Sequence, residues 1–143
     1  MRTDPWKLLV LSVILVALPA RAEQASQTRA ARDAVEGAWR LEKIVRPSGS
    51  LETQGGFLFH GGYYSTAVNY SQEGTQTNIS QFGTYALEGN LLSLLPSVQV
   101  STRGQVVIYE SEPPFSLDLS VTGDEMKGVS VKDGTTFVFR RLR

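Results

Sequence analysis

Val35-Glu36-Gly37-Ala38-Trp39-Arg40-Leu41-Glu42-Lys43-Ile44-Val45 is the stretch from which the fold of this chain can be inferred. Its residues divide into two alternating sets, one with Trp39, Leu41, Lys43 and Val45 and the other with Ala38, Arg40, Glu42 and Ile44. Successive side chains of a β-strand point to opposite faces of the sheet, so this period of two is typical of a half-buried strand. Gly37 has no side chain and lets the backbone turn closely where the strand begins. The stretch therefore predicts the first strand of an antiparallel barrel.

Short strands separated by tight turns are predicted along the rest of the chain. The expected strands are Gly55–Phe59, Tyr63–Tyr70, Phe82–Glu88, Leu91–Pro96 extended by Val98–Thr102, Gln105–Glu110, Phe115–Val121, Glu125–Val131 and Thr135–Arg141. Turn residues lie between them, at His60-Gly61-Gly62, Gly89-Asn90, Arg103-Gly104, Pro113-Pro114, Gly123-Asp124 and Asp133-Gly134. Closing such a meander removes its exposed edges. We therefore expect an all-β fold, a single up-and-down barrel of eight or nine strands, with a β-sandwich as the alternative.

Several of these motifs resemble those of a known family. Gly37-Ala38-Trp39 resembles the Gly-X-Trp signature of the lipocalins and of the bacterial lipocalin-like domains, which are calycin-type barrels that bind small ligands. The likeness extends from Val35 to Leu142 and includes a hairpin, a turn and an aromatic last strand with arginines, at Gly56-Phe57-Leu58-Phe59…Gly61-Gly62-Tyr63-Tyr64-Ser65, Phe82-Gly83-Thr84-Tyr85-Ala86-Leu87-Glu88-Gly89-Asn90 and Thr135–Arg141. The resemblance implies a barrel that holds one small molecule.

The same resemblance implies a structural role for three residues. In the family the tryptophan closes one end of the barrel, and an arginine of the last strand packs over its ring. Here these positions are Trp39 and Arg141, with Arg140 as the second choice and Gly37 at the strand entrance. A guanidinium stacked on an indole gains roughly 0.5–2 kcal/mol. The ligand specificity of the family does not carry over, because the pocket residues vary with the ligand.

The beginning of the chain has the pattern of a secretory signal. The first seven residues carry two basic side chains, and residues 8–18 are almost wholly apolar. Ala20-Arg21-Ala22 places small residues at the two positions that a signal peptidase recognises. A transmembrane span needs about 20 apolar residues, so this run is short for one. We expect residues 1–22 to be a signal peptide cleaved before Glu23, with an uncleaved anchor as the alternative, and the mature chain to be secreted or periplasmic without stable membrane insertion.

Charge and cysteine content restrict the remaining function classes. The chain has 143 residues, 14 basic and 14 acidic side chains and no cysteine. Removing residues 1–22 leaves 11 basic and 13 acidic groups, a formal charge of −2 without any basic run, so we expect no nucleic-acid partner. A secreted domain without disulfides depends on its core or on closure of its sheet. Asn69 and Asn78 begin glycosylation sequons, which matter only in a eukaryotic secretory pathway.

Two segments are predicted to lie outside the barrel strands. Residues 23–34 are polar and rich in alanine, and we expect a disordered beginning followed by a short helix over Thr28 to Val35 that plugs one barrel end. Ser71–Ser80 is polar and lacks aromatic residues, which favours a longer loop or a short helix. Long loops at the mouth of such scaffolds often carry function, so Ser71–Ser80 is a candidate contact for a protein partner. The expected organisation is a signal peptide over 1–22, a polar segment over 23–34 and a barrel domain over 35–143.

Alternation along the strands predicts which side chains lie inside the barrel. A barrel of about eight strands either is filled by its side chains or holds one small ligand. Tyrosines on the inner wall would orient such a ligand through their hydroxyl groups, whereas on the outer wall they would form cross-strand pairs. The predicted lining residues are Phe57, Phe59, Tyr64, Tyr85, Leu87, Tyr109, Leu117, Phe137 and Phe139, and Leu92, Leu94, Val107, Phe115, Leu119 and Thr135 are expected to face inward as well.

Patterns for catalysis or metal binding are sparse. His60 is the only histidine and lies beside Gly61-Gly62, so we expect a solvated imidazole, no metal site and no cofactor. The chain has no Gly-X-Ser-X-Gly elbow, and we name no catalytic residue. An acid turned inward near Tyr109 would have a raised pKa and is the one route to an enzyme. The acids within or beside strands are Glu88, Glu110, Glu112 and Asp118.

Three functions are compatible with these observations. The first, which we favour, is a carrier of a small hydrophobic molecule, held by shape and by one or two tyrosine or arginine contacts. The second is a solid barrel that acts as an interaction or inhibitor module through Ser71–Ser80. The third is a barrel cyclase or isomerase that holds an apolar substrate in a chosen conformation. A cavity open to solvent separates the first and third from the second, and an ionisable side chain in that cavity favours the third.

Overall fold

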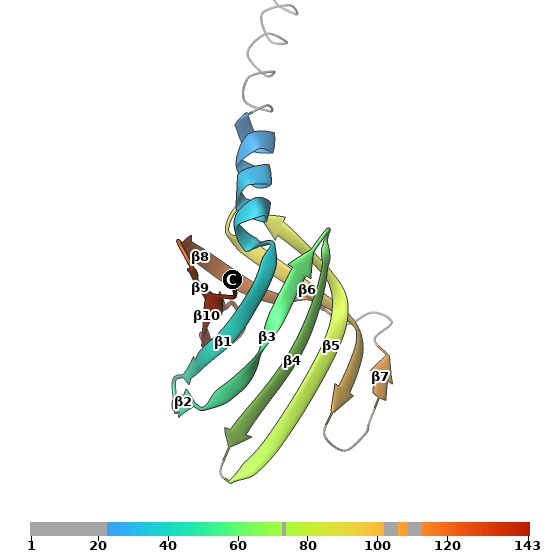
Figure 1. The fold of residues 1–143 in the computed structure, drawn as a ribbon, viewed down its shortest axis with the longest axis vertical. Helices are drawn as coiled ribbons and strands as arrows, with labels where there is room; N and C mark the ends of the chain where they lie inside the picture. The colour runs from blue at the N-terminus through green and yellow to red at the C-terminus, as the bar shows by residue number, and fades with distance from the viewer. Residues whose placement is uncertain (1–22, 73, 102–105, 109–112) are drawn as a thin grey trace, which may run out of the picture.

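The described part of the chain folds into ten antiparallel strands preceded by a helix (Figure 1). The structure is a computed structural model that describes residues 23–143 apart from residue 73 and the segments 102–105 and 109–112. The predicted signal peptide therefore lies outside the described residues. The strands are β1 (Gly37–Arg46), β2 (Gly49–Leu51), β3 (Thr53–His60), β4 (Tyr63–Gln72), β5 (Thr75–Glu88), β6 (Leu91–Ser101), β7 (Val106–Ile108), β8 (Phe115–Thr122), β9 (Glu125–Ser130) and β10 (Thr136–Arg141).

Eight of these strands form a closed ring. Their hydrogen-bonded order is β1-β3-β4-β5-β6-β8-β9-β10, and β10 pairs with β1 to complete the barrel. The two short strands pair with ring strands. β2 pairs with β1 on the same edge as β3, and β7 pairs with β6 on the same edge as β8. The predicted up-and-down barrel is confirmed, and the β1–β10 pairing excludes the β-sandwich.

The alternation predicted for the first strand holds only as far as Leu41. A register shift between Leu41 and Lys43 marks a bulge in the pairing of β1 with β10. Trp39, Leu41 and Ile44 are buried, whereas Lys43 is exposed. A bulge adds one residue to one strand, so the inward side chains change parity at that point. The expectation that Lys43 shares a face with Trp39 is therefore wrong beyond the bulge.

The described residues of Ser71–Ser80 belong to the β4–β5 hairpin, and the prediction of a loop or helix there is wrong. β4 and β5 pair in uninterrupted register from Tyr63 with Thr84 to Gln72 with Thr75. Alternate residues of β5 are shielded from solvent, beginning with Thr77 and Ile79. Threonine and isoleucine are branched at Cβ and favour strands. The segment is therefore part of a strand hairpin, and the partner contact expected there stays a prediction.

The N-terminal helix covers residues 23–35, so the expected disordered beginning is also wrong. Its alanines have the highest helix propensity of any residue. The helix stands on one end of the barrel and projects away from it (Figure 1). Ala31 packs against the core and Val35 is buried, whereas most of the residues before Ala31 are exposed. Only the last turn therefore plugs the barrel.

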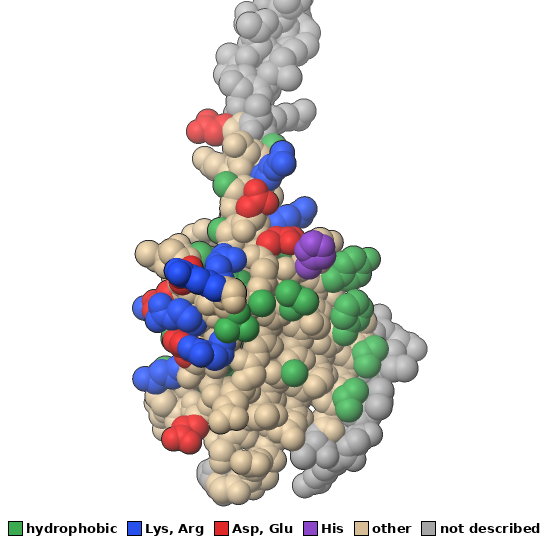
Figure 2. All heavy atoms as spheres, in the orientation of Figure 1, with side chains coloured by type: hydrophobic (Ala, Val, Ile, Leu, Met, Phe, Trp, Pro, Cys, Tyr) green, Lys and Arg blue, Asp and Glu red, His purple; other side chains and the backbone are tan. Residues whose placement is uncertain are grey.

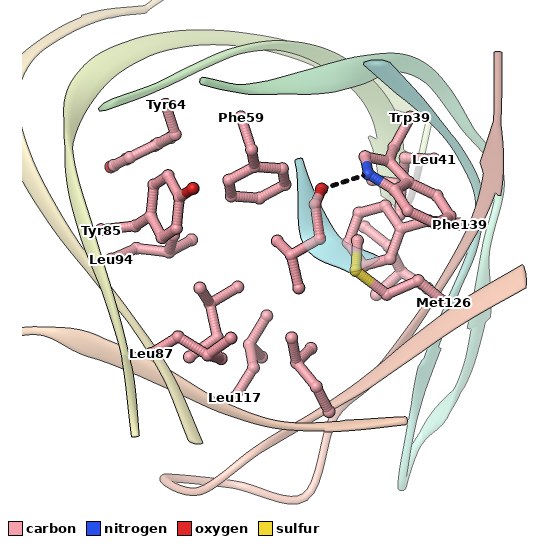
Figure 3. Packing of buried hydrophobic residues seen from close by; sticks show 14 residues of the cluster. Trp39, Leu41, Phe59, Tyr64, Tyr85, Leu87, Leu94, Leu117, Met126 and Phe139 are labelled. Carbon is pink, nitrogen blue, oxygen red and sulfur yellow. Dashed lines mark hydrogen bonds between the residues drawn. The ribbon is translucent and has the colours of Figure 1, made fainter. Parts of the chain in front are cut away.

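The buried apolar side chains converge inside the barrel (Figure 3). Burying each of them stabilises the fold by roughly 1.5–3 kcal/mol. Most of them lie in the half of the barrel next to the helix, which is therefore filled. The members of this closed half are Val35, Trp39, Phe59, Tyr85, Leu87, Leu92, Leu117, Leu119, Met126 and Phe139.

Charge is distributed unevenly around the outer wall. From Thr53 to Ser101, the span of strands β3 to β6, the chain has no lysine or arginine and only two acids. Figure 2 shows the charged side chains of the barrel on the left of the view, over β1 and the C-terminal strands. Arg140 lies there within 3.7 Å of Glu42 and 3.6 Å of Glu125. The outer wall thus has one charged flank and one uncharged flank.

Candidate functional site

The closed end of the barrel is built from the helix, Trp39 and Arg141. The indole Nε1 of Trp39 donates a hydrogen bond to the carbonyl oxygen of Val35 at 2.7 Å. The guanidinium of Arg141 lies 4.1 Å from the centre of the Trp39 ring and donates to the carbonyl oxygens of Glu36 at 2.8 Å and Ala34 at 2.5 Å. The last carbonyl groups of a helix have no partners within the helix, and a cation there also complements the helix dipole. These side chains therefore cap the helix and close the barrel together.

Gly37 is required where Arg141 passes the strand entrance. Its φ is +119°, a conformation that residues with a side chain rarely adopt. A Cβ at this position would meet Nη1 of Arg141 at 3.0 Å. Arg140, the second choice for the arginine over the indole, points instead to the outer wall and its acids. The structure places Gly37, Trp39 and Arg141 as the family resemblance implies.

Glu36, which the sequence did not single out, is the polar centre of the closed end. Its Oε1 accepts hydrogen bonds from the Tyr85 hydroxyl and from the Gly61 N–H, both at 2.8 Å. Its Oε2 lies 3.3 Å from Nδ1 of His60, whose side chain is 89% exposed. The imidazole is solvated as expected, but it has a carboxylate partner that no sequence spacing indicated. None of these groups faces the cavity described below, so the cluster ties the helix end to β5 and the β3–β4 turn.

The hydrogen bonds of this cluster shift two pKa values. The hydrogen bond from Tyr85 is the largest influence on Glu36 and holds the pKa of its carboxyl below the ordinary value, with smaller contributions from Gly61 and His60. Burial, and then the bond to Glu36, raise the pKa of Tyr85 to about 12. The folded chain therefore favours ionised Glu36 and protonated Tyr85, the pair of states in which their hydrogen bond forms.

A cavity of about 420 Å³ occupies the other half of the barrel, and its lining reaches Arg46 at the end of β1 and the β9–β10 turn, opposite the helix. Every ring strand except β9 contributes to its wall, together with the turn that follows β9. Its lining is mostly apolar. The lining residues are Leu41, Ile44, Arg46, Phe57, Tyr64, Thr66, Val68, Tyr70, Ile79, Gln81, Leu94, Pro96, Phe115, Asp133, Thr135 and Phe137.

A series of aromatic rings runs from this cavity into the core. Phe115 meets Phe137 edge to face, with ring centres 5.8 Å apart, and Phe137 stacks on Phe139 at 6.5 Å. Phe139 in turn meets Phe57 edge to face at 5.3 Å, and Phe57 stacks on Phe59 at 5.9 Å. Such offset and edge-to-face arrangements are the preferred geometries of aromatic pairs. These contacts set the orientations of Phe57, Phe115 and Phe137 where they line the cavity.

Most of the uncharged polar side chains of the cavity lie on β4 and β5, and Thr135 is a further one next to β10. The Tyr64 hydroxyl lies 3.5 Å from Oε1 of Gln81, and Nε2 of Gln81 donates to Oε1 of Gln99 at 2.6 Å. The Thr66 hydroxyl donates to the carbonyl oxygen of Gly56 at 2.9 Å. Tyr64 and Thr66 are both buried, so these are polar groups with little access to bulk water.

Two charged residues of opposite sign complete the lining. Arg46 ends β1, and Asp133 lies in the turn between β9 and β10. The Thr135 N–H donates to Oδ1 of Asp133 at 3.0 Å, and this hydrogen bond is the main reason that the pKa of Asp133 is lowered. An acid with a lowered pKa is ionised and weakly basic at neutral pH, so it is poorly matched to proton transfer.

The structure divides the predicted lining residues into two groups. Phe57, Tyr64 and Phe137 line the cavity, whereas five others pack in the filled half, namely Phe59, Tyr85, Leu87, Leu117 and Phe139. Tyr109, Glu110, Glu112 and the side chain of Val107 lie outside the described residues. Leu92, Leu94, Leu119 and Thr135 are buried, as alternation predicted, and Phe115 lines the cavity although it is partly exposed.

Several lining residues were missed by sequence reasoning. Ile79 and Gln81 fall in or beside the segment mistaken for a loop, and Ile44 was assigned to the wrong face because of the bulge in β1. The alternation Ile79, Gln81, Gly83, Tyr85, Leu87 along β5 was a usable signal. The tyrosines take both expected positions: Tyr64 and Tyr70 line the cavity, whereas Tyr63 stacks on Phe82 on the outer wall at 6.0 Å.

Other candidate chemistry is absent from the part of the chain that the structure describes. Glu88 and Asp118 are exposed, and no group of three or more histidine or acidic side chains is placed to hold a metal ion within residues 23–72, 74–101, 106–108 and 113–143. Asn69 and Asn78 are exposed and lie opposite each other on β4 and β5. No helix in the described segments is long and apolar enough to cross a membrane.

Comparison with protein families and with curated proteins identifies no match. No protein-family profile matches the chain, and no curated protein matches it. The closed eight-stranded antiparallel barrel is consistent with a calycin-like architecture. What the cavity holds must therefore be argued from its own residues.

Proposed function

We propose that this chain is a secreted or periplasmic lipocalin-like protein that binds one small hydrophobic molecule in the open half of its barrel. The observation that carries the proposal is the division of the barrel into a filled half and an open half. Fourteen buried apolar side chains form the core cluster, yet the other end keeps a cavity of about 420 Å³. Ligand sites are typically concave and mostly apolar, with a few polar groups and volumes of about 300–1,000 Å³.

The rigidity of the wall supports a binding role. The cavity is enclosed by continuous hydrogen-bonded strands, and its floor is the packed core that includes Leu41, Tyr64 and Leu94. A preformed site of this kind loses little conformational entropy when it binds its ligand. The lowered pKa of Asp133, the acid in the cavity lining, makes it poorly matched to proton transfer at neutral pH, which favours a carrier over a cyclase or isomerase.

The first test of the proposal is native mass spectrometry of the mature protein purified from its own host, followed by titration with fluorescent hydrophobic probes. Val68→Phe places a ring in the cavity, and Ala67→Phe, its neighbour on the outer wall, is the matched control. We expect a retained or added ligand in the wild type and in Ala67→Phe and a large loss of affinity in Val68→Phe. Equal binding by the two variants would place the ligand elsewhere, and bare protein that binds no probe would contradict the carrier function. Fractionation of host cells tests the location.

A further inference from the structure

The cavity is lined unevenly, with aromatic rings on several sides and the amide of Gln81 on β5. In a ring of eight strands, the strand four places away lies opposite, so β5 faces β10 and β3 faces β8. Gln81 of β5 therefore lies across the cavity from Phe137 of β10, and Phe57 of β3 lies across from Phe115 of β8. A molecule in the cavity meets aromatic rings on several sides and an amide with its neighbouring hydroxyls on one side.

The aromatic side suits a planar ring system. Phe115 and Phe137 stand nearly perpendicular, with an interplanar angle of 84°, and belong to the series of rings that continues to Phe59. Rings in such a series present faces and edges in fixed directions, and a further planar ring gains from the same offset and edge-to-face contacts. A flexible alkyl chain would bury apolar area there without using this geometry.

The polar side requires hydrogen-bonding groups on the ligand. The side-chain amide of Gln81 has two N–H groups and two acceptor lone pairs, and its bonds to Gln99 and Tyr64 use one of each. The Thr66 hydroxyl donates to Gly56 and keeps its oxygen as an acceptor. A ligand that displaces water from these groups without replacing its hydrogen bonds leaves buried polar atoms unsatisfied, which is costly. A hydroxyl group both donates and accepts, so it matches Gln81 and Thr66 together.

The charges of the cavity do not select a carboxylate. Arg46 and Asp133 are the only charged residues among the described residues that line it, and their formal charges cancel. Pairing of β1 with β10 places Val45 opposite Thr136, so the ends of the lining that carry Arg46 and Asp133 come together. An anion attracted to Arg46 is therefore also repelled by Asp133. The polar groups of β4 and β5 deeper in the cavity are all neutral.

The geometry points to an uncharged ligand with a planar apolar ring system and a hydroxyl group directed at Gln81. This inference rests on the proposed function, and it specifies the chemical class of the molecule that the same cavity holds. It separates the chain from carriers of fatty acids, whose ligands have a flexible tail and a carboxylate head.

Three fluorescent probes with one skeleton test the inference: anthracene, 2-anthrol and anthracene-2-carboxylate, each titrated into the mature protein at pH 7.5, where the phenol is uncharged. We expect 2-anthrol to bind about tenfold or more tightly than either of the other two, which corresponds to about 1.4 kcal/mol. In Gln81→Leu the preference for 2-anthrol over anthracene should disappear while anthracene binding is kept. Gln76→Leu, an exposed glutamine on the same strand, is the control and should behave as the wild type.

The outcomes separate the two proposals. If anthracene-2-carboxylate binds most tightly, or if anthracene equals 2-anthrol in the wild type, the cavity binds ligands but the inference about their polar group is overturned. If 2-anthrol is preferred and Gln81→Leu leaves that preference unchanged, Gln81 is not the group that selects it and the inference also fails. If none of the three probes binds although the purified protein retains another ligand, the inference fails and the carrier function stands, whereas bare protein that binds no hydrophobic probe contradicts the carrier function itself.

Discussion

The guanidinium of Arg141 lies 4.1 Å from the centre of the Trp39 indole, although 102 positions separate the two residues in the chain. This contact joins the first and last strands of the barrel at the point where Trp39 pairs with Arg141 in the ladder. The same two side chains donate to the last carbonyl groups of the N-terminal helix. One contact thus closes the ring of strands and fixes the helix to it.

Removing the Arg141 side chain should therefore destabilise the fold. Arg141→Ala loses the stacking on Trp39 and two hydrogen bonds from a charged donor, and we expect a loss of about 3 kcal/mol in the free energy of unfolding. Urea denaturation followed by circular dichroism measures it. Arg140→Ala removes an exposed arginine from the same strand and should cost at most about 1 kcal/mol. Equal losses in the two variants would mean that Arg141 has no special role.

Trp39 should be the most sensitive single position of the closed end. Its side chain is fully buried, and Trp39→Ala should cost roughly 3–5 kcal/mol because of the cavity it leaves. Trp39→Phe keeps part of the ring but loses the hydrogen bond to Val35, so we expect an intermediate loss. Thermal unfolding of the mature protein measures both variants. An unchanged melting temperature in Trp39→Ala would show that the indole does not organise this end.

Substitution of Gly37 should destabilise the fold for two reasons, and a matched variant distinguishes them. Gly37→Ala forces a side chain into a positive φ and places a Cβ against Arg141. Gly49→Ala meets a similar φ of +133° with nothing within 4 Å, so it carries the backbone strain alone. Strain of this kind costs on the order of 1–3 kcal/mol, and we expect Gly37→Ala to lose more stability than Gly49→Ala. Denaturation midpoints of both variants decide the point, and equal losses would mean that Arg141 accommodates the added methyl group.

The bond between Glu36 and Tyr85 should make stability depend on pH at both extremes. The pKa of Glu36 is lower in the folded chain than its ordinary value of 4.5, so its contribution is present above that value and is lost as pH falls through the lowered folded pKa. The pKa of Tyr85 is raised from 10.0 to about 12, so its contribution is complete below pH 10 and is lost as pH rises towards 12.

Two variants test this dependence. Unfolding midpoints between pH 3 and pH 7 should fall less steeply in Glu36→Gln than in the wild type, and Tyr85→Phe should remove part of the loss above pH 10. Glu88→Gln, at an exposed strand acid, is the control for the acidic side. If Glu36→Gln and the wild type lose stability in parallel as pH falls, the Glu36 cluster is not responsible for it.

The barrel could be predicted from sequence because its determinants are local. Alternation and glycine turns mark most strands, and Trp39 with the terminal arginines indicated which ends meet. The bulge after Leu41 could not be predicted, since it depends on how β1 pairs with β10. Likewise, the polar half of β5 is held as a strand by pairing with β4 and, from Ile79 on, with β6, which its polar composition did not indicate.

The candidate site was harder to predict from sequence, because it too depends on residues that are far apart in the chain. The bond between Glu36 and Tyr85 spans 49 positions, and no spacing rule connects them. Whether a barrel is filled depends on how the volumes of side chains from all eight strands add up, so single residues do not indicate it. The alternation rule therefore identified inward side chains but did not separate Phe57, which lines the cavity, from Phe59, which packs in the core.

The pairing of β1 with β10 has a consequence for the order of the chain itself. The N–H of Leu142 donates to the carbonyl oxygen of Ala38 at 2.9 Å, so the two ends of the barrel sequence are immediate neighbours in space. A ring of antiparallel hairpins that closes on itself has no intrinsic first strand. A linker that runs from Leu142 along the helix to its first residue, about 20 Å away at about 1.5 Å per helical residue, with new ends at the exposed Gly123 turn, would give a circular permutant with the same set of strand pairs (Figure 1). The order in which the strands are synthesised is therefore separable from the barrel they build.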